Sequence, residues 1–552
     1  MNMRSNLVKE YIAPTRILAK SDNVENEKAL LTNNSKQIFL KEKNYLRCYG
    51  KGYVILDFGK EMHGGVRLLS HYLEGQKTLL NIRIRFGESL GEACAELGEK
   101  NATCDHSVRD ITTTLPDLCD QEWGQTGFRF VRIDFLDEDK EYRLVNVYAA
   151  STFRDLSYKG NFECDDPLVN DIYQTARYTI YVNMQTSLWE GIKRDRLVWV
   201  GDMQPQVLAI TDIFGADECV EDALQMSIDK NPLPCWFGNI PTYSFWLIQI
   251  LYDYYMKVKN TRFVMKQMPY VDGVLQQLDG CVTEDGDIDY SLIDVDARNG
   301  YFLDWPTNGT KDAKAGNRFM FIYTLHNLKK LYVELNLTEN PLCDKLLTKL
   351  KKIKEKDVQA KQIVALGYLS EEIEKDEAAK KLTDGGAKGL STFMSYFILK
   401  AIAESKDTES AISIMKEYYG GMLSRGATSF WEDFDVEWLK NSGRIDEFTP
   451  PNQLDLHGDF GKFCYKGFRH SLCHGWSCGP VQFLTENILG VQVLDSGCKK
   501  IAIHPNLGGL KWCKGVFPTP YGNVQISHRV VDGKVLTTVE GPSSVQIRIN
   551  DR

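Results

Sequence analysis

The hydrophobic period of the chain changes twice along its 552 residues, and this change constrains the fold more than any other feature. Between about Tyr45 and Tyr148, apolar and polar residues alternate, as in the run Val131–Phe135 (VRIDF). A two-residue period is typical of a half-buried strand. No long helical pattern interrupts this region, so it favours a β-sandwich over alternating strand–helix units.

The pattern becomes helical at Asp166-Pro167, where Asp166 suits an N-cap and Pro167 the first helical position. Apolar stripes at helical spacing follow, for example from Leu247 to Val258. Helices are also expected over residues 391–404 and 409–419, the second ended by Gly420-Gly421. The long loops over residues 231–243 and 289–317 are of a kind that is often functional.

Strand periodicity returns after about Val491, and Asp532-Gly533 between two alternating runs is a β-hairpin signal. We therefore predict a multidomain α+β protein. Its domains are an N-terminal β-sandwich over residues 1–155, a helical domain over residues 156–490 and a small C-terminal β-sandwich over residues 491–552. The period alone leaves open whether the helices form a toroid of helical hairpins.

Composition limits the classes of function. The net charge is −9, from 66 basic and 75 acidic residues, which argues against a protein whose main function is to bind nucleic acid. The chain has no apolar run long enough to span a membrane and begins without the apolar core of a secretory signal. Fourteen cysteines without a CxxC pair are typical of reduced thiols. We expect a cytoplasmic protein that acts without nucleic acid or membrane partners, with a homodimer left open.

The most informative stretch is Trp189–Asp202 (WEGIKRDRLVWVGD), which holds three carboxylates, three cations and two tryptophans within fourteen residues. Sugar sites use such a mixture, because tryptophan faces pack on the C–H face of a pyranose while carboxylates and arginine bind its hydroxyls. The alternative is a solvated, salt-bridged helix start, although such a surface needs neither the glycines nor the tryptophans.

Two further stretches place a tryptophan beside a carboxylate. Trp431 precedes Glu432, and Trp305 follows Asp304. A metal interpretation of the nearby Asp294 and Asp296 lacks the spacing of an EF-hand loop, so no metal site is predicted.

Hydrolysis of a glycosidic bond needs two carboxyl groups, one protonated acid and one base or nucleophile. Asp195 and Glu432 are the candidates, and a closed fold must bring them together across 237 positions of sequence. His474 is another candidate for the pocket, although a histidine among Cys and Leu is more often a core residue. The chain shows no nucleophile elbow, P-loop or dinucleotide fingerprint.

The run from Glu190 to Asp202 resembles the central motif of glycoside hydrolase family 78, the bacterial α-L-rhamnosidases. Other segments are similar in the same order: 56–68, 127–131, 243–255, 304–305 and 426–432. The resemblance covers roughly residues 50–540. It implies an (α/α)6 toroid flanked by β-sandwich domains, and hydrolysis with inversion and without a cofactor.

The resemblance also implies roles for individual residues. Asp195 stands at the position of the general acid, where many members carry glutamate, and Glu432 at that of the general base. Inversion implies that the two carboxyl groups lie about 6.5–9.5 Å apart, leaving room for water. The residues expected to bind the sugar are Glu190, Arg194, Trp199, Asp202, Trp305 and His474, to which Trp431 is added because it adjoins Glu432.

We therefore predict an inverting exo-glycosidase that removes terminal α-L-rhamnose from a glycoside or oligosaccharide. One alternative is an enzyme of the same fold that acts on another sugar, including a polysaccharide lyase. Another is a carbohydrate-binding protein that has lost catalysis, although the presence of both Asp195 and Glu432 argues against it. A structural helical scaffold explains neither the Trp–carboxylate pairs nor the long loops.

Overall fold

The computed structural model describes residues 6–34, 36–72, 79–292, 301–463 and 465–550. The chain forms two compact units. The β-rich unit comprises Met1–Asp155, Tyr181–Leu197 and Met422–His474, and the helical unit comprises Leu156–Ile180, Val198–Gly421 and Gly475–Arg552. Each unit is assembled from separate stretches of sequence. The division into three domains at 155/156 and 490/491 stays a prediction.

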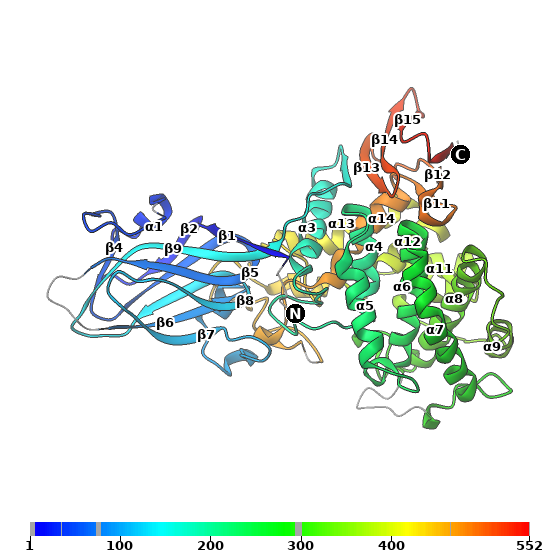
Figure 1. Cartoon of the computed structure of the whole chain (residues 1–552), viewed down its shortest axis with the longest axis horizontal. Coiled ribbons are helices and arrows are strands. Elements are labelled where there is room, and N and C mark those ends of the chain that lie inside the picture. Colours follow the sequence, from blue (N-terminus) through cyan, green and yellow to red (C-terminus); the bar gives the residue numbers. More distant parts are fainter. Residues whose placement is uncertain (1–5, 35, 73–78, 293–300, 464, 551–552) are drawn as a thin grey trace. The chain divides into compact units, whose positions relative to one another are not determined.

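A sheet of nine strands among the described residues dominates the β-rich unit. Its centre consists of β5 (Gly52–Ser70), β8 (Asp120–Phe135) and β9 (Glu141–Arg154), which pair antiparallel and run side by side in Figure 1. The remaining strands are β1 (Leu7–Ile12), β2 (Arg16–Lys20), β3 (Val24–Glu25), β4 (Leu46–Tyr49), β6 (Leu80–Gly87) and β7 (Asp110–Leu115).

The predicted strand at VRIDF is confirmed as the end of β8. Val131, Ile133 and Phe135 are buried in the core, whereas the two charged residues between them are only partly buried. Gly64 allows β5 to approach β9 closely, because a Cβ there would lie 2.0 Å from the Ala150 carbonyl oxygen. Beyond β6, the short helix α2 (Leu90–Cys94) begins at Ser89, whose hydroxyl accepts the Glu92 N–H at 3.1 Å. This cap places Glu88 and Glu92 next to each other in the interior.

Among the described residues, six helices form the core of the helical unit. Each contacts the next in a closed ring, in the order α4–α6–α8–α10–α12–α14 and back to α4. Their bounds are α4 Met203–Ile213, α6 Pro241–Val258, α8 Ala313–Glu334, α10 Lys361–Leu369, α12 Ser395–Ser405 and α14 Gly479–Asn487. Every residue of α4 is buried, as is typical of a helix surrounded by others. The stripe predicted from Leu247 is buried up to Tyr255, and Val258 is partly buried.

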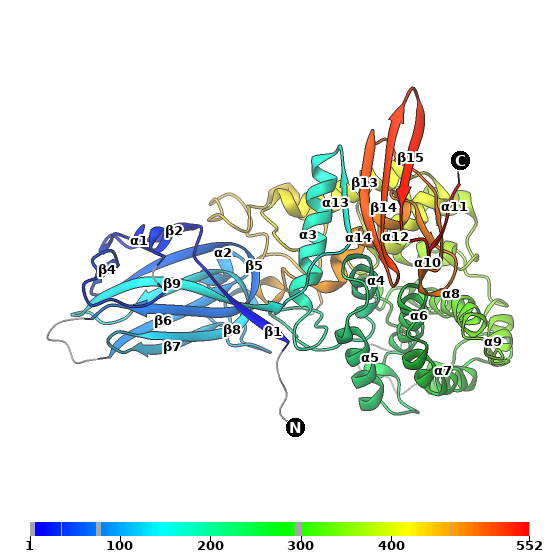
Figure 2. The same ribbon diagram turned by 45° about the horizontal axis from the view of Figure 1, so that its top comes forward.

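The remaining helices include α3 (Pro167–Asn183), α5 (Glu218–Lys230), α7 (Thr261–Cys281), α9 (Leu342–Leu350), α11 (Lys375–Thr383) and α13 (Thr408–Ser424). Figure 2 shows α5, α7 and α9 beside helices of the ring. The predicted N-cap is confirmed, since Asp166 Oδ1 accepts the Leu168 N–H at 2.9 Å. No helix among the described residues is both long and apolar enough to cross a membrane.

The prediction that Gly420-Gly421 ends a helix is wrong, because α13 continues through both residues to Ser424. A Cβ on Gly420 would lie 3.1 Å from Leu168 Cδ2, so this glycine serves close packing of side chains against the helix. The left-handed glycine after the helix is Gly426, with φ +91°. The predicted loops are also shorter than expected, because α6 begins at Pro241 and α8 at Ala313.

Two small sheets complete the helical unit. One has the order β10–β13–β14–β15 and the other β11–β12–β16. Their bounds are β10 Asn161–Cys164, β11 Val491–Val493, β12 Lys500–Ile503, β13 Trp512–Thr519, β14 Gly522–Val531, β15 Lys534–Glu540 and β16 Gln546–Ile549. The predicted hairpin is confirmed: Val531 pairs with Lys534 across Asp532 (φ 50°) and Gly533 (φ 75°), positive values that two-residue hairpin turns require.

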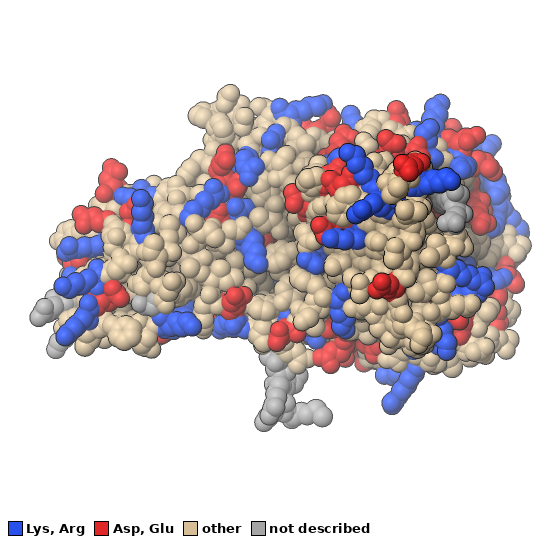
Figure 3. Space-filling model, turned by 90° about the horizontal axis from the view of Figure 1, so that it is seen from above, with Lys and Arg blue, Asp and Glu red and all other residues tan. Residues whose placement is uncertain are grey.

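Charged side chains of both signs mix over the surface in view in Figure 3, and that face shows no broad area of a single sign.

Candidate active site

Glu190 holds the loop that carries Asp195. Its Oε2 accepts the Leu197 N–H at 3.0 Å, and its Oε1 accepts the N–H of Asp195 itself. Glu190 is buried, so these charge-assisted hydrogen bonds form away from bulk water. Gly191 allows the backbone of this loop to come close to Arg194, because a Cβ at position 191 would lie 2.3 Å from the Arg194 carbonyl oxygen. Glu190 therefore fixes the backbone from which the Asp195 side chain projects.

Arg194 connects the two candidate carboxylates. Its Nη2 lies 2.8 Å from each carboxylate oxygen of Glu432, and its Nη1 donates to Asp195 Oδ1 at 2.7 Å. The Arg469 carbonyl oxygen accepts from Nε at 3.0 Å, and the Tyr465 ring lies under the guanidinium at 5.3 Å. One buried cation thus holds two acidic side chains that are 237 positions apart in sequence.

Glu432 lies in an environment that disfavours its charge. The residue is only 4% exposed, and burial raises its pKa to about 7, although the charge of Arg194 acts to lower it. The Ser471 N–H donates to Oε2 at 3.1 Å. A carboxyl group with a pKa near neutrality can both accept and release a proton under physiological conditions.

Asp195 is more open, with 19% of its side chain exposed. Besides Arg194, its Oδ1 lies 3.0 Å from His106 Nε2. The two candidate carboxylates therefore lie in different environments: Glu432 is deeply buried and paired with a cation, whereas Asp195 reaches solvent.

His474 and Trp431 belong to the same unit as these carboxylates. His474 Nε2 lies 3.6 Å from Glu432 Oε1, too far for a hydrogen bond, and burial lowers the His474 pKa well below its usual value. Trp431 is only 1% exposed and packs edge-on against Phe434 at 5.6 Å between ring centroids. Its indole Nε1 has no hydrogen-bond partner among the described residues.

The other predicted sugar contacts lie in the helical unit and gather around Tyr243. The Tyr243 hydroxyl donates to Asp202 Oδ1 at 2.7 Å, and its ring lies edge-on to Trp199 at 6.4 Å. Phe302 joins the group at 5.9 Å from Tyr243, and Trp305 lies 5.1 Å from Phe302. The structure therefore brings Trp199, Asp202 and Trp305 together through two aromatic rings.

The predicted site residues fall into two sets. Glu190, Arg194, Asp195, Trp431, Glu432 and His474 are in the β-rich unit, and Trp199, Asp202 and Trp305 are in the helical unit. Asp294 and Asp296 lie outside the described residues.

Several residues that contact or adjoin the predicted ones were not predicted, among them Tyr243, Lys193 and His106. Tyr243 lay in a quoted motif and could have been chosen for its place near the start of a helix. Lys193 adjoins Arg194 and could have been chosen for that reason, whereas nothing in the sequence singled out His106.

Lys193 is the cation of a buried cluster. Its Nζ lies 3.0 Å from Glu88 Oε2 and 3.2 Å from Glu92 Oε1, and it donates to the carbonyl oxygens of Phe468 and His470 at 3.0 and 2.7 Å. Burial disfavours its charge, but the two glutamates outweigh this and raise the Lys193 pKa. The residue before Arg194 is therefore fixed to two other segments of the unit.

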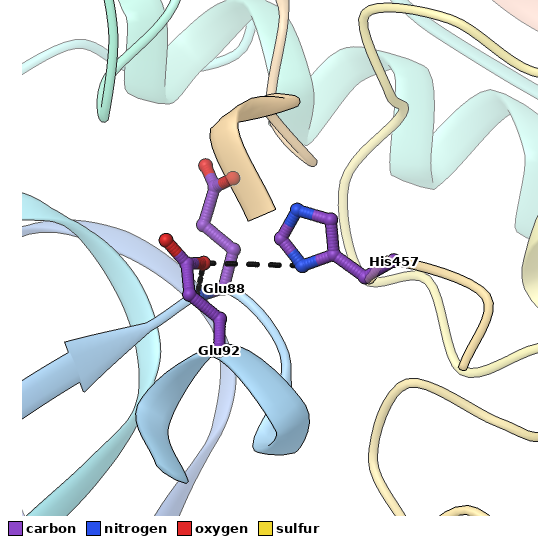
Figure 4. Close-up of side chains that lie close together, drawn as sticks. All are labelled: Glu88, Glu92 and His457. Carbon is purple, nitrogen blue, oxygen red and sulfur yellow. Dashed lines mark hydrogen bonds and ion pairs between the residues drawn. The ribbon is translucent and has the colours of Figure 1, made fainter. Parts of the chain in front are cut away.

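Glu88, Glu92 and His457 together have the side-chain types of a metal site, and Figure 4 shows the three converging from the turn between β6 and α2, from α2 itself and from a distant loop. Both ring nitrogens of His457 are engaged, Nδ1 with Ser89 Oγ at 2.7 Å and Nε2 with the His470 carbonyl oxygen at 2.8 Å. Since Lys193 already contacts both carboxylates, we interpret the cluster as an internal ion network.

Family models match two parts of the chain. Residues 157–356 match the bacterial α-L-rhamnosidase six-hairpin glycosidase domain, and residues 490–550 match the bacterial α-L-rhamnosidase C-terminal domain. A curated α-L-rhamnosidase from Alteromonas sp. (strain LOR) is 22% identical over 541 residues, which cover 86% of this chain and 53% of that protein.

Solved structures share the fold. A family 78 rhamnosidase from Bacillus sp. GL1 matches with a TM-score of 0.74 and 20% identity, over 95% of this chain and 55% of its own. A Klebsiella oxytoca rhamnosidase with rhamnose bound matches with a TM-score of 0.67 and 18% identity, over 87% of this chain and 96% of its own. The chain thus spans about half the length of the Alteromonas and Bacillus proteins. Residues 157–356 and 490–550 thus match two domains of bacterial α-L-rhamnosidases, in agreement with the resemblance of the motif from Glu190 to Asp202.

Proposed function

We propose that this chain is an inverting glycoside hydrolase that removes terminal α-L-rhamnose from glycosides or oligosaccharides. The observation that carries the proposal is the bridge formed by Arg194, which holds Asp195 and Glu432 on one guanidinium. The match to the rhamnosidase six-hairpin domain and the rhamnose bound to the Klebsiella relative support the choice of sugar.

In the proposed reaction Asp195 is the general acid. It gives its proton to the glycosidic oxygen as the bond from that oxygen to the anomeric carbon breaks. Its partial exposure supports this role, because a leaving group must reach it and solvent must return the proton afterwards.

Glu432 is the general base. It takes a proton from a water molecule whose oxygen attacks the anomeric carbon from the opposite face, so the free sugar has the inverted configuration. The base must be ionised to act. Arg194 favours that form against burial, and the resulting pKa of about 7 suits a base that works near neutral pH.

The remaining roles follow from contacts. Glu190 positions Asp195, while Arg194 and neutral His474 line the base. The sugar is bound by Trp199, Asp202, Tyr243 and Trp305. The buried side chain of Trp431 stabilises the position of the neighbouring Glu432. The contacts from α4 round to α14 support an (α/α)6 arrangement of the helical unit.

Hydrolysis of a panel of chromogenic monosaccharide glycosides, followed by NMR of the first product anomer, tests the proposal. Release of L-rhamnose as the inverted anomer is the expected result. Release of the retained anomer contradicts the mechanism, and cleavage of another sugar in place of rhamnose contradicts the substrate.

A further inference from the structure

A cavity of about 680 Å³ opens in the helical unit at the C-terminal ends of the ring helices. Five of its lining residues stand close to the last residue of their helix: Asp212 on α4, Lys257 on α6, Lys330 on α8, Glu404 on α12 and Glu486 on α14. Its volume lies within the roughly 300–1,000 Å³ of small-molecule sites.

This cavity is separate from the sugar contacts proposed above. Asp202 precedes the first residue of α4, and Asp212 is the last residue but one. Ten residues of α-helix rise roughly 15 Å, so the two carboxylates mark opposite ends of the ring. Trp305 likewise precedes α8, which carries Tyr323 at its middle and Lys330 in its C-terminal half.

The cations of the cavity are already paired. Lys257 contacts Asp212 and donates to Gln482 Oε1 at 2.6 Å, and Lys400 donates to Glu486. Lys330 donates to an amide oxygen, and burial lowers its pKa. The lining holds four lysines and five carboxylates, a balance that favours neither an anionic nor a cationic ligand.

Hydrogen-bonding capacity remains after this pairing. Asp253 accepts one hydrogen bond on each oxygen, from Gln204 at 2.9 Å and Gln249 at 3.0 Å, which leaves lone pairs on both.

Tyrosine hydroxyls supply the complementary donors. Tyr252 and Tyr323 both line the cavity beside Asp253. A hydroxyl group both donates and accepts, so a ligand rich in hydroxyls can satisfy carboxylate oxygens and tyrosine hydroxyls together.

We propose that this cavity binds a neutral, polyhydroxylated ligand of mono- to disaccharide size, at the end of the helix ring opposite Asp202. This site does not depend on the hydrolytic activity. It gives the protein a second carbohydrate contact that takes no part in bond cleavage.

Saturation-transfer NMR with the full chain tests the proposal. The probes are L-rhamnose, D-glucose, maltose and cellobiose, and the proteins are the unaltered chain, Tyr323→Phe, Asp253→Asn and Asp202→Asn. At least one probe should bind and lose affinity about fivefold in Tyr323→Phe, the effect of one hydrogen bond, but not in Asp202→Asn. Thermal unfolding of each variant checks that it is folded, and Tyr323→Phe removes only one oxygen atom.

Three results would overturn the proposal. The first is that no probe binds, and the second is that binding is unchanged in both Tyr323→Phe and Asp253→Asn. The third is that inorganic phosphate competes with the sugar for the cavity. Hydrolysis of glycosides by Tyr323→Phe should equal that of the unaltered chain, so failure of this proposal and failure of the proposed enzymatic function are distinguishable.

Discussion

Arg194 Nη2 lies 2.8 Å from both carboxylate oxygens of Glu432, while the neighbouring Nη1 of the same guanidinium contacts Asp195 at 2.7 Å. The cation thereby opposes the burial that would keep Glu432 protonated. This relationship sets the pH at which Glu432 can act as a base, and the first prediction follows from it.

In the pH profile of kcat/KM, the midpoint of the acidic limb should lie near pH 7. Burial raises the Glu432 pKa to about 7, so the base is protonated and inactive below that pH and becomes ionised above it. Arg194→Gln removes a charge that lowers this pKa, so the limb should move to higher pH. The measurement is kcat/KM for a rhamnoside from pH 4 to 9. An acidic limb below pH 5, or one that Arg194→Gln leaves in place, would contradict the prediction.

Substrates with different leaving groups should distinguish the roles of the two carboxylates, because only a poor leaving group needs a proton from the acid. Asp195→Asn should lose about 10²–10⁴-fold in kcat on a rhamnoside with an alkyl aglycone, but far less on a dinitrophenyl rhamnoside, which needs no proton. Glu432→Gln should lose activity on both. Glu437→Gln, five positions after Glu432 and more exposed, is the matched control and should keep full activity. The reverse pattern would exchange the two roles.

Lys193→Met should destabilise the protein by about 3–5 kcal/mol, because it removes the cation paired with buried Glu88 and leaves Glu92 with only Arg109, 3.7 Å away. Urea unfolding measures the loss. Lys440→Met is the control, since the Lys440–Glu437 pair is exposed and such pairs contribute at most about 1 kcal/mol. Equal effects in the two variants would show that the Lys193 cluster is not the anchor inferred from its contacts.

Glu190→Gln should lower kcat about 10- to 100-fold while the protein stays folded. Both carboxylate oxygens of Glu190 accept hydrogen bonds from backbone N–H groups. The side chain of glutamine would instead point its NH₂ group at one of these N–H donors. Glu190→Asp keeps two acceptors on a shorter side chain and should retain more activity. Steady-state kinetics with circular dichroism distinguishes the two, and equal kcat for Gln and Asp would show that the second acceptor is unimportant.

Tyr243→Phe should raise KM several-fold with a smaller change in kcat. The variant removes the hydroxyl that donates to Asp202 but keeps the ring between Trp199 and Phe302. Asp202 then loses the bond that orients it toward a sugar hydroxyl. Tyr270→Phe, which removes a hydroxyl bound to the Asn231 carbonyl oxygen elsewhere in the helical unit, is the control. A kcat loss with KM unchanged would argue against a role in sugar binding.

Local chemistry was predictable from the sequence. The alternation of VRIDF, the cap at Asp166-Pro167 and the turn at Asp532-Gly533 each depend on residues close in sequence, and all three are confirmed. The motif from Glu190 to Asp202 was sufficient to indicate a resemblance to bacterial α-L-rhamnosidases, and it lies within the residues that match their six-hairpin domain.

Only the tertiary structure decided which distant residues meet. Gly420-Gly421 looks like a helix end in isolation, but α13 continues to Ser424, and Leu168 lies close to Gly420. The sequence also did not show that Lys193 pairs with Glu88 and Glu92, or that Arg194 reaches Glu432. Burial and charge at a carboxylate depend on neighbours hundreds of positions away, so residue types alone determined the candidates, and long-range packing determined the pKa that suits Glu432 to act as a base.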